Sequence, residues 1–406
     1  MKNEKKAITN AKEVRQNKLN VPTLRFRDFS DSWVLTPIKK LLRFQNGINA
    51  ESTKYGKGIK YISVSDILNN QYITYDCIKG LIDIDEKTLK KFIVEYGDIL
   101  FQRSSETFED IGRANVYLDK ERPATFGGFV IRGKKISNYN PLFFRYLLCT
   151  HNARKQTVRM GAGAQHYNIG QDGLEKISLF FPSLPEQDKI AYFIDCLDER
   201  IATQNKIISK YESLIKGIRH RIFTSIDNSK RVQLGSFLEE YSEKNTANNL
   251  QSVAVGKYGI RKREDIYSRE LSSDYSKNKV IRKDTLIIGM GSTQIDIGIL
   301  TTDDCYCVSP AYTTYHIKGI NSFYLQEYLI EMNPLLSVRY MITSARQGKA
   351  VNKDDLMRHF LTVHSLNQQE KICKHFKSLY RRLQIEKEML SALQKQKAFL
   401  LQSMFI

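Results

Sequence analysis

Hydrophobic residues recur at alternating steps of four and three in two stretches of the chain, the pattern of a helix with one apolar stripe. The first follows Pro185 and places apolar side chains at Ile190, Ile194, Leu197, Ile201, Ile208 and Ile215. The second repeats that register 182 residues later with Ile372, Phe376, Leu379, Leu383, Leu390 and Leu393. Gln204 and Glu386 take the same place in both, either to set the pairing register or because the seam tolerates them. The pattern predicts two long helices that pair with each other.

The segments before the two helices also resemble one another. Short runs rich in β-branched and aromatic residues, bounded by turn residues, predict strands in both. At an offset of 186 residues, three short segments have counterparts: Gly97-Asp-Ile-Leu100 in Lys283-Asp-Thr-Leu286, Gly112 in Gly298, and Ile131-Arg-Gly133 in Ile317-Lys-Gly319. At an offset of 182, Ile169–Phe223 aligns without gaps onto Val351–Phe405. A register kept through strand, loop and helix predicts a duplicated unit of domain plus helix.

We therefore expect an α+β protein with two repeated α/β domains, separated and closed by two long antiparallel coiled-coil helices in a pseudo-twofold arrangement. Each helix would span roughly 55 Å, and two domains held in this way could read half-sites about one B-DNA turn apart. The expected parts are a mobile basic tail over 1–20, a first domain over 21–184, a central helix over 185–226, a second domain over 227–365 and a C-terminal helix over 366–406.

The charge balance suggests the partner. The 406 residues carry a formal net charge of +19, which favours a polyanion such as double-stranded DNA. A membrane surface is the weaker alternative, because the sequence has no run of eighteen apolar residues and no lipidation motif. The polar N-terminus has no apolar signal core, so we expect the chain to stay in the cytoplasm.

Motifs for catalysis are missing from the sequence. It contains no P-loop, no dinucleotide fingerprint between strand and helix, no His-Glu-x-x-His and no Gly-x-Ser-x-Gly. The six cysteines are scattered, which indicates reduced packing residues rather than a metal site. Asn140-Pro141 and Asn333-Pro334 are each expected to open a helix. The chain is thus interpreted as a binding protein with no metal or cofactor of its own.

Three kinds of segment are suited to touch DNA, through phosphate neutralisation or base-edge hydrogen bonds. The first is a basic run with an interleaved tyrosine, whose residues are Lys257, Tyr258, Arg261, Lys262 and Arg263, with first-domain counterparts Lys54, Lys57 and Lys60. The second is the polar turn after the Gly-Asp strand, with Arg103, Ser104, Ser292 and Gln294. The third is the glycine-rich loop before the helix, with Gln165, His166, Arg346, Gln347 and Lys349. The alternative for each is a solvated polar surface. Because these loops differ between the domains, we expect an asymmetric bipartite site.

These features together resemble the specificity subunits of type I restriction-modification systems, the HsdS family. The resemblance rests on Pro22-Thr-Leu-Arg-Phe-Arg-Asp-Phe29 with Trp33, the two Gly-Asp-Ile-Leu-like strands, Pro185-Glu-Gln-Asp-Lys-Ile190 and Leu400-Leu-Gln-Ser-Met-Phe405. It covers nearly everything after the tail and departs at Asn367-Gln-Gln-Glu370, where the family usually has a proline before Glu-Gln.

The resemblance implies a non-catalytic chain with two target-recognition domains, each reading half of a bipartite DNA site. It also implies helices that set the spacer and bind two methyltransferase subunits, with a translocating endonuclease subunit joining for restriction. S-adenosylmethionine, ATP and Mg would belong to those partners. Two alternatives remain open: a nuclease or modification enzyme with a degenerate site, which would act on DNA alone, and a coiled-coil scaffold with no preference among DNA sequences.

Overall fold

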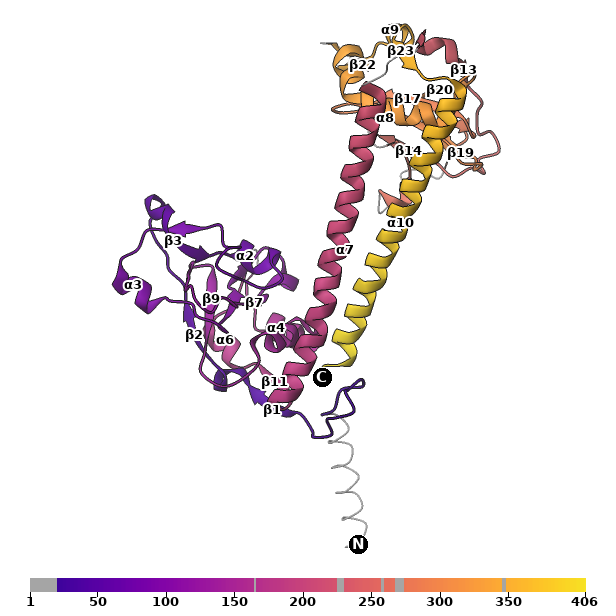
Figure 1. Ribbon diagram of the computed structural model, residues 1–406. Coiled ribbons are helices and arrows are strands. Elements are labelled where there is room, and N and C mark those ends of the chain that lie inside the picture. Colours follow the sequence, from indigo (N-terminus) through magenta and orange to yellow (C-terminus); the bar gives the residue numbers. More distant parts are fainter. Residues whose placement is uncertain (1–19, 164–165, 225–229, 257–258, 267–273, 345–347) are drawn as a thin grey trace. The chain divides into compact units, whose positions relative to one another are not determined.

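The computed structural model describes residues 20–163, 166–224, 230–256, 259–266, 274–344 and 348–406. The chain divides into two compact units, Met1–Gln204 with Met389–Ile406 (unit 1) and Asn205–Glu388 (unit 2). Two long helices, α7 (Leu184–Thr224) and α10 (Leu366–Ser403), each contribute to both units (Figure 1). The central helix therefore begins one residue earlier than the expected 185, and its expected end at 226 lies outside the described residues.

In unit 1 the main sheet has the antiparallel strand order β2-β9-β5-β7. A smaller sheet has the order β4-β3-β8, and β1 pairs with β11. The strands of this unit are β1 (Val34–Pro37), β2 (Leu42–Asn46), β3 (Tyr55–Ile62), β4 (Leu81–Ile82), β5 (Ile99–Gln102), β6 (Ser104–Ser105), β7 (Ala114–Val116), β8 (Thr125–Phe126), β9 (Val130–Lys135), β10 (Tyr167–Asn168) and β11 (Ser178–Phe181). Its shorter helices are α2 (Val64–Asn69), α3 (Glu86–Lys91), α4 (Pro141–Cys149), α5 (His151–Arg159) and α6 (Gln171–Glu175).

In unit 2 the main sheet has the antiparallel order β13-β20-β17-β18. The strands here are β12 (Lys230–Gln233), β13 (Leu238–Tyr241), β14 (Val253–Gly256), β15 (Gly259–Lys262), β16 (Lys279–Ile281), β17 (Thr285–Met290), β18 (Ile295–Leu300), β19 (Tyr306–Val308), β20 (Thr313–Ile317), β21 (Met341–Ser344), β22 (Gly348–Val351) and β23 (Phe360–Val363). The helices that lie wholly in this unit are α8 (Ser322–Tyr340) and α9 (Lys353–Met357). If the four strands of each main sheet are numbered in chain order, both sheets have the spatial order 1-4-2-3. The shared order confirms the predicted repeat.

The strand register corrects the matching of individual residues. Asp98 N donates to Glu95 O (3.1 Å) in unit 1, and Thr285 N donates to Arg282 O (3.1 Å) in unit 2. The residue before the donor is left-handed in both turns, with φ of 89° at Gly97 and 62° at Asp284. Asp284 therefore corresponds to Gly97, and the offset in this strand is 187 residues rather than 186. In that register Ile287 corresponds to Leu100. Ile287 pairs with Gly298 and Leu100 pairs with Asn115, so the counterpart of Gly298 is Asn115 and not Gly112.

Each long helix is attached to its domain by a glutamine. Gln187 Oε1 accepts from Asn140 N (3.0 Å), and its Nε2 donates to Pro182 O (3.0 Å). Gln369 makes the same two bonds, from Asn321 N (3.0 Å) and to His364 O (2.9 Å). We call this pair of contacts the glutamine clamp. Its backbone donors, Asn140 and Asn321, also cap α4 and α8 with their side chains.

The expectation for Asn333-Pro334 is wrong. Asn140 precedes α4 as predicted, but Asn333 and Pro334 lie inside α8. Asn333 is buried there, and its Nδ2 donates to Ile295 O at 3.0 Å, which joins the helix to β18. The counterpart of Asn140 is Asn321, which has no proline after it to signal the helix start.

The two long helices are antiparallel. In unit 2, Glu212 pairs with Lys387 (2.8 Å), while Arg219, further along α7, bonds Tyr380, which lies earlier on α10 (2.7 Å). Within this seam Ile208, Ile215, Phe376 and Leu383 are buried, and Ile372 and Leu379 are half-buried. In unit 1, Ile190, Ile194, Leu197 and Leu393 are buried, and Ile201 and Leu390 are half-buried. Gln204 and Glu386 are also buried, and Arg382 pairs with Glu386 at 2.7 Å.

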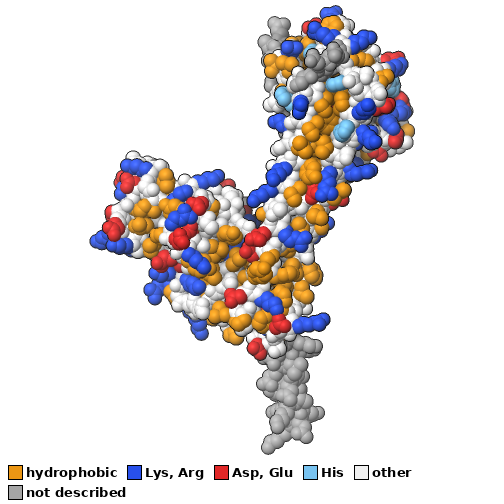
Figure 2. Space-filling model, in the orientation of Figure 1, with side chains coloured by type: hydrophobic (Ala, Val, Ile, Leu, Met, Phe, Trp, Pro, Cys, Tyr) orange, Lys and Arg blue, Asp and Glu red, His pale blue; other side chains and the backbone are white. Residues whose placement is uncertain are grey.

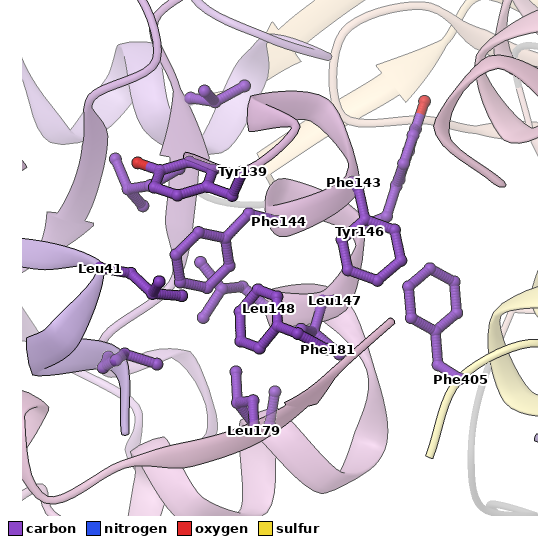
Figure 3. Close-up of a cluster of buried hydrophobic side chains, with 14 of the residues drawn as sticks. Leu41, Tyr139, Phe143, Phe144, Tyr146, Leu147, Leu148, Leu179, Phe181 and Phe405 are labelled. Carbon is purple, nitrogen blue, oxygen red and sulfur yellow. The ribbon is translucent and has the colours of Figure 1, made fainter. Parts of the chain in front are cut away.

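The unit 1 core joins the domain to the helix pair. Phe143, Phe144 and Phe181 pack in edge-to-face and tilted contacts, and Phe405 stacks on Phe143 at 5.3 Å between ring centroids (Figure 3). Trp33 is buried against the same two rings. Aromatic side chains bury large apolar areas, so this cluster holds the domain against the end of α10.

Candidate nucleic-acid interface

Three loops of unit 1 meet at one end of its main sheet. Gly47 follows β2, Phe129 precedes β9, Arg103 follows β5 and Arg113 precedes β7. Asn46 pairs with Ile131, Gln102 with Val130 and Phe101 with Ala114, so all four lie at the same sheet end. We call this end the loop edge of unit 1.

Hydrogen bonds bring several predicted residues together at this edge. Arg103 donates through its backbone N to Phe129 O (2.9 Å) and through Nη1 to Gly128 O (3.3 Å). Ser104 Oγ donates to Asn168 Oδ1, and Asn168 Nδ2 donates to His166 O (3.3 Å). Arg103, Ser104 and the exposed His166 are therefore neighbours. Gln165 lies outside the described residues.

The three predicted lysines lie on β3 or just before it. Two of them, Lys57 and Lys60, interact with groups of their own domain. Lys57 pairs with Asp83 (3.1 Å), and both side chains are exposed. Lys60 Nζ donates to Ile78 O (2.5 Å) and lies over the Tyr75 ring. Lys54 is exposed at the start of the strand. In this structure Lys60 therefore supports its own domain and does not project into solvent.

In unit 2 the predicted residues fall on two elements. Arg261 and Lys262 are exposed on β15, which pairs with β14, and Arg263 begins the following turn. Ser292 and Gln294 lie in the turn between β17 and β18, at the sheet end that corresponds to the loop edge of unit 1. A cavity of about 300 Å³ lies between β15 and β18, lined by residues that include Ile260, Gly298 and Gln326.

The remaining predicted residues of unit 2 have no described side chain. Lys257, Tyr258, Arg346 and Gln347 lie outside the described residues. Lys349 belongs to β22, whose backbone pairs with Thr343 of β21. On the face in Figure 2, lysine and arginine side chains are spread over both domains rather than gathered in one patch.

A basic pocket next to the loop edge escaped the sequence reasoning. It has a volume of about 290 Å³, and Arg113, Arg145 and Arg154 are among its lining residues. Burial lowers the pKa of Arg154, and the nearby positive charge of Arg113 lowers it further. Arg154 Nη2 donates to Ile111 O (2.7 Å), which fixes the guanidinium in place. The three arginines are separate in sequence, so no local motif could have shown that they share a pocket.

Among the described residues, no group of three or more histidine, cysteine or acidic side chains is arranged to hold a metal ion. In the same part of the chain, no helix is long and apolar enough to cross a membrane. The chemistry of the loop edge is that of arginine, hydroxyl and amide groups, which bind phosphates and base edges.

Comparison with known proteins shows what this chain is similar to. Residues 33–213 match the model described as the type I restriction modification DNA specificity domain. The chain is similar to a putative type I restriction enzyme MjaX specificity subunit from Methanocaldococcus jannaschii, with 22% identity over 397 residues that cover 91% of this chain and 92% of the relative.

Solved structures agree at the level of the fold. The S subunit of a type I restriction-modification system from M. genitalium superposes with a TM-score of 0.56 and 16% identity, covering 95% of this chain and 99% of that one. A chain from a structure on complex assembly and conformational transition of the type I R-M system gives a TM-score of 0.53 and 14% identity, covering 93% and 95%. The domain model over residues 33–213, the relative along most of the chain and the shared fold together support an HsdS-family protein, a specificity subunit of the type I restriction-modification kind.

Proposed function

We propose that the chain reads a bipartite, asymmetric DNA site, one half with each unit, and has no catalytic activity alone. The observation that carries this proposal is the pair of topologically equivalent sheets whose corresponding ends carry different side chains. Arg103 and Ser104 occupy that end in unit 1, and Ser292 and Gln294 occupy it in unit 2. A shared framework with different reading groups suits two different half-sites.

The same proposal gives the long helices two roles. They set the spacer between the half-sites, and they dock two methyltransferase subunits, with restriction subunits joining the complex. Apolar side chains left exposed on the two helices support the docking role, because such groups favour burial against a partner. They are Tyr192, Leu214, Ile385, Met389 and Phe399. S-adenosylmethionine, ATP and Mg then belong to the partner subunits.

Sequencing for N6-methyladenine tests the proposal. The chain is co-expressed with a cognate methyltransferase subunit in a host that lacks adenine methylation. The expected result is one new motif with two specified parts and a fixed gap, and no methylation from either subunit alone. Methylation by the purified chain would instead show an enzyme. A stable complex that methylates no defined motif would favour the scaffold alternative.

A Tyr192→Glu variant tests the docking role. We expect it to reduce co-purification with the methyltransferase subunit, because the carboxylate would be buried in the interface. Lys206→Glu, an exposed substitution on the same helix at a polar position, is the control for an added charge. Equal recovery of the complex for both variants and the wild type would refute docking at Tyr192.

A further inference from the structure

Phe129 is an exposed aromatic side chain at the loop edge of unit 1. Its exposed fraction is 70%, among the highest of the large hydrophobic residues in the described part of the chain. Single exposed hydrophobic residues are common on protein surfaces and need no function by themselves. The position and rigidity of this one carry the argument.

The loop that presents Phe129 is fixed on both sides. Val130 N donates to Gly127 O (2.9 Å) to close the turn, and Gly127 N donates to Ile62 O (3.0 Å). Phe129 O accepts from Arg103 N (2.9 Å). A Cβ at Gly128 would lie 1.6 Å from Asn49 Oδ1, so the neighbouring loop packs directly on the glycine backbone. The ring is thus held out by a backbone that has little freedom to withdraw it.

The neighbours of Phe129 are polar and basic. Arg103 bonds its loop, and Ser104, Asn168 and His166 follow along the same edge. Such surroundings do not suit an apolar protein partner, which would leave these polar groups desolvated. They do suit DNA, where arginine and hydroxyl groups meet phosphates and base edges while an apolar wedge enters between base steps.

Unit 2 has the same turn without the aromatic side chain. Tyr312 N donates to Ser309 O (3.1 Å), as Val130 N does to Gly127 O, so Ala311 takes the place of Phe129. The nearby Tyr312 ring packs on the backbone of Gly289, and its hydroxyl donates to Val255 O (3.1 Å). That ring is therefore directed into the domain, and the exposed residues at this turn of unit 2 are Pro310 and Ala311, neither of which is aromatic.

We propose that Phe129 inserts at a base step of the half-site read by unit 1 and unstacks it, whereas the matching turn of unit 2 has no aromatic side chain to insert. This inference rests on the proposed function. Apart from the adenines that the methyltransferase extrudes for methylation, it predicts an unstacked base step in one half-site only. Specificity at that step then comes from how easily the sequence unstacks, in addition to hydrogen bonds with base edges.

The experiment uses the complex with the methyltransferase subunit and duplexes that carry the motif found by methylation sequencing. 2-Aminopurine, whose fluorescence rises when it is unstacked, replaces one base at a time in each half-site. At positions other than the methylated adenines, which the methyltransferase itself extrudes, we expect a fluorescence increase at one step of the first half-site with the wild type, and none at that step with Phe129→Ala. Affinity should fall about tenfold in the variant, as expected for the loss of one aromatic–base contact.

Two further variants act as controls. Phe129→Tyr keeps the ring and should retain the fluorescence increase, while Ala311→Gly at the matching turn should change neither signal. Because Phe129 is exposed, thermal unfolding of the Phe129→Ala complex should match the wild type. Equal fluorescence and affinity for wild type and Phe129→Ala would overturn the inference and leave the proposed function intact. A wild-type complex with no bipartite motif would overturn both.

Discussion

The two units close the same backbone turn with different side chains. The turn before the second sheet strand closes with a side chain that accepts from the backbone, Asp98 from Glu95 N (3.0 Å) in unit 1 and Thr285 from Arg282 N (3.2 Å) in unit 2. Asp98 also pairs with Arg132 (2.7 Å), and both are almost fully buried. Thr285 instead shares a hydrogen bond with the hydroxyl of Tyr241 (2.8 Å). Duplication conserved the backbone geometry, and the buried polar groups diverged around it.

The largest effect should come from breaking the ion pair of unit 1. Arg132→Met leaves the Asp98 carboxylate buried without its charged partner, which costs about 3–5 kcal/mol. Burial already raises the pKa of Asp98, and removing the guanidinium raises it further. Trp33, the single tryptophan, lies in the unit 1 core, so its fluorescence during denaturation follows this unit selectively.

Replacing the ion pair of unit 1 with the threonines found at the matching positions of unit 2 separates the effect of the unpaired charge from that of packing. Asp98→Thr with Arg132→Thr removes both charges and should recover part of the lost stability, because no unpaired charge remains buried. Were the double variant as unstable as Arg132→Met, the cost would lie in packing and not in the unpaired charge.

The next effect concerns the glutamine clamp. Gln187→Ala and Gln369→Ala each leave one backbone N–H and one carbonyl without their partner, at about 1–3 kcal/mol per buried group. Hydrogen exchange read by mass spectrometry should show lost protection in α4 for the first variant and at the start of α8 for the second. Loss in both units from one substitution would contradict independent clamps.

A smaller effect is expected at the reading residues of unit 2. Arg261→Ala with Arg263→Ala should weaken DNA binding about tenfold and leave assembly with the methyltransferase intact, because the changes remove two positive charges that are expected to contact phosphates or bases. Gel-shift titrations on the methylated motif measure this. Lys244→Ala, an exposed substitution in the same unit, is the control. Affinity and site preference equal to wild type would remove these residues from the interface.

The smallest effect is a pH dependence confined to unit 2. Burial lowers the pKa values of His359 and His364, whose Nδ1 atoms hydrogen-bond Tyr340 (2.9 Å) and Tyr324 (2.8 Å). The unfolded chain then binds protons more readily, so unit 2 loses stability as pH falls through about 6.5 toward the folded pKa values. Exchange protection, corrected for intrinsic rates, should drop between pH 7 and 5 in unit 2, and His359→Gln with His364→Gln should flatten the change.

The helical seam and the duplication were predictable because they depend on periodicity, which local sequence records. The register of the second sheet strand could not be predicted, because Asp98 and Asp284 are the same residue type in different structural positions. Asp98 is the side-chain acceptor of the turn, whereas Asp284 is its left-handed residue. Aspartate tolerates the left-handed backbone that Gly97 adopts, so Asp284 takes the position of Gly97, and Thr285 is the side-chain acceptor at the position of Asp98. Phe129 also gave no local signal, since its exposure depends on loops that meet only in the folded sheet.

The glutamine clamp has a consequence for how such a chain can evolve. Its four partners are backbone atoms, and the acceptors belong to residues as different as Pro182 and His364. The clamp itself therefore does not depend on the side chains that the domain carries at these positions. Surface loops can mutate, or be replaced by recombination, without a compensating change at the junction. Selection for new target sequences can then proceed in one unit while the architecture of the chain is inherited unchanged.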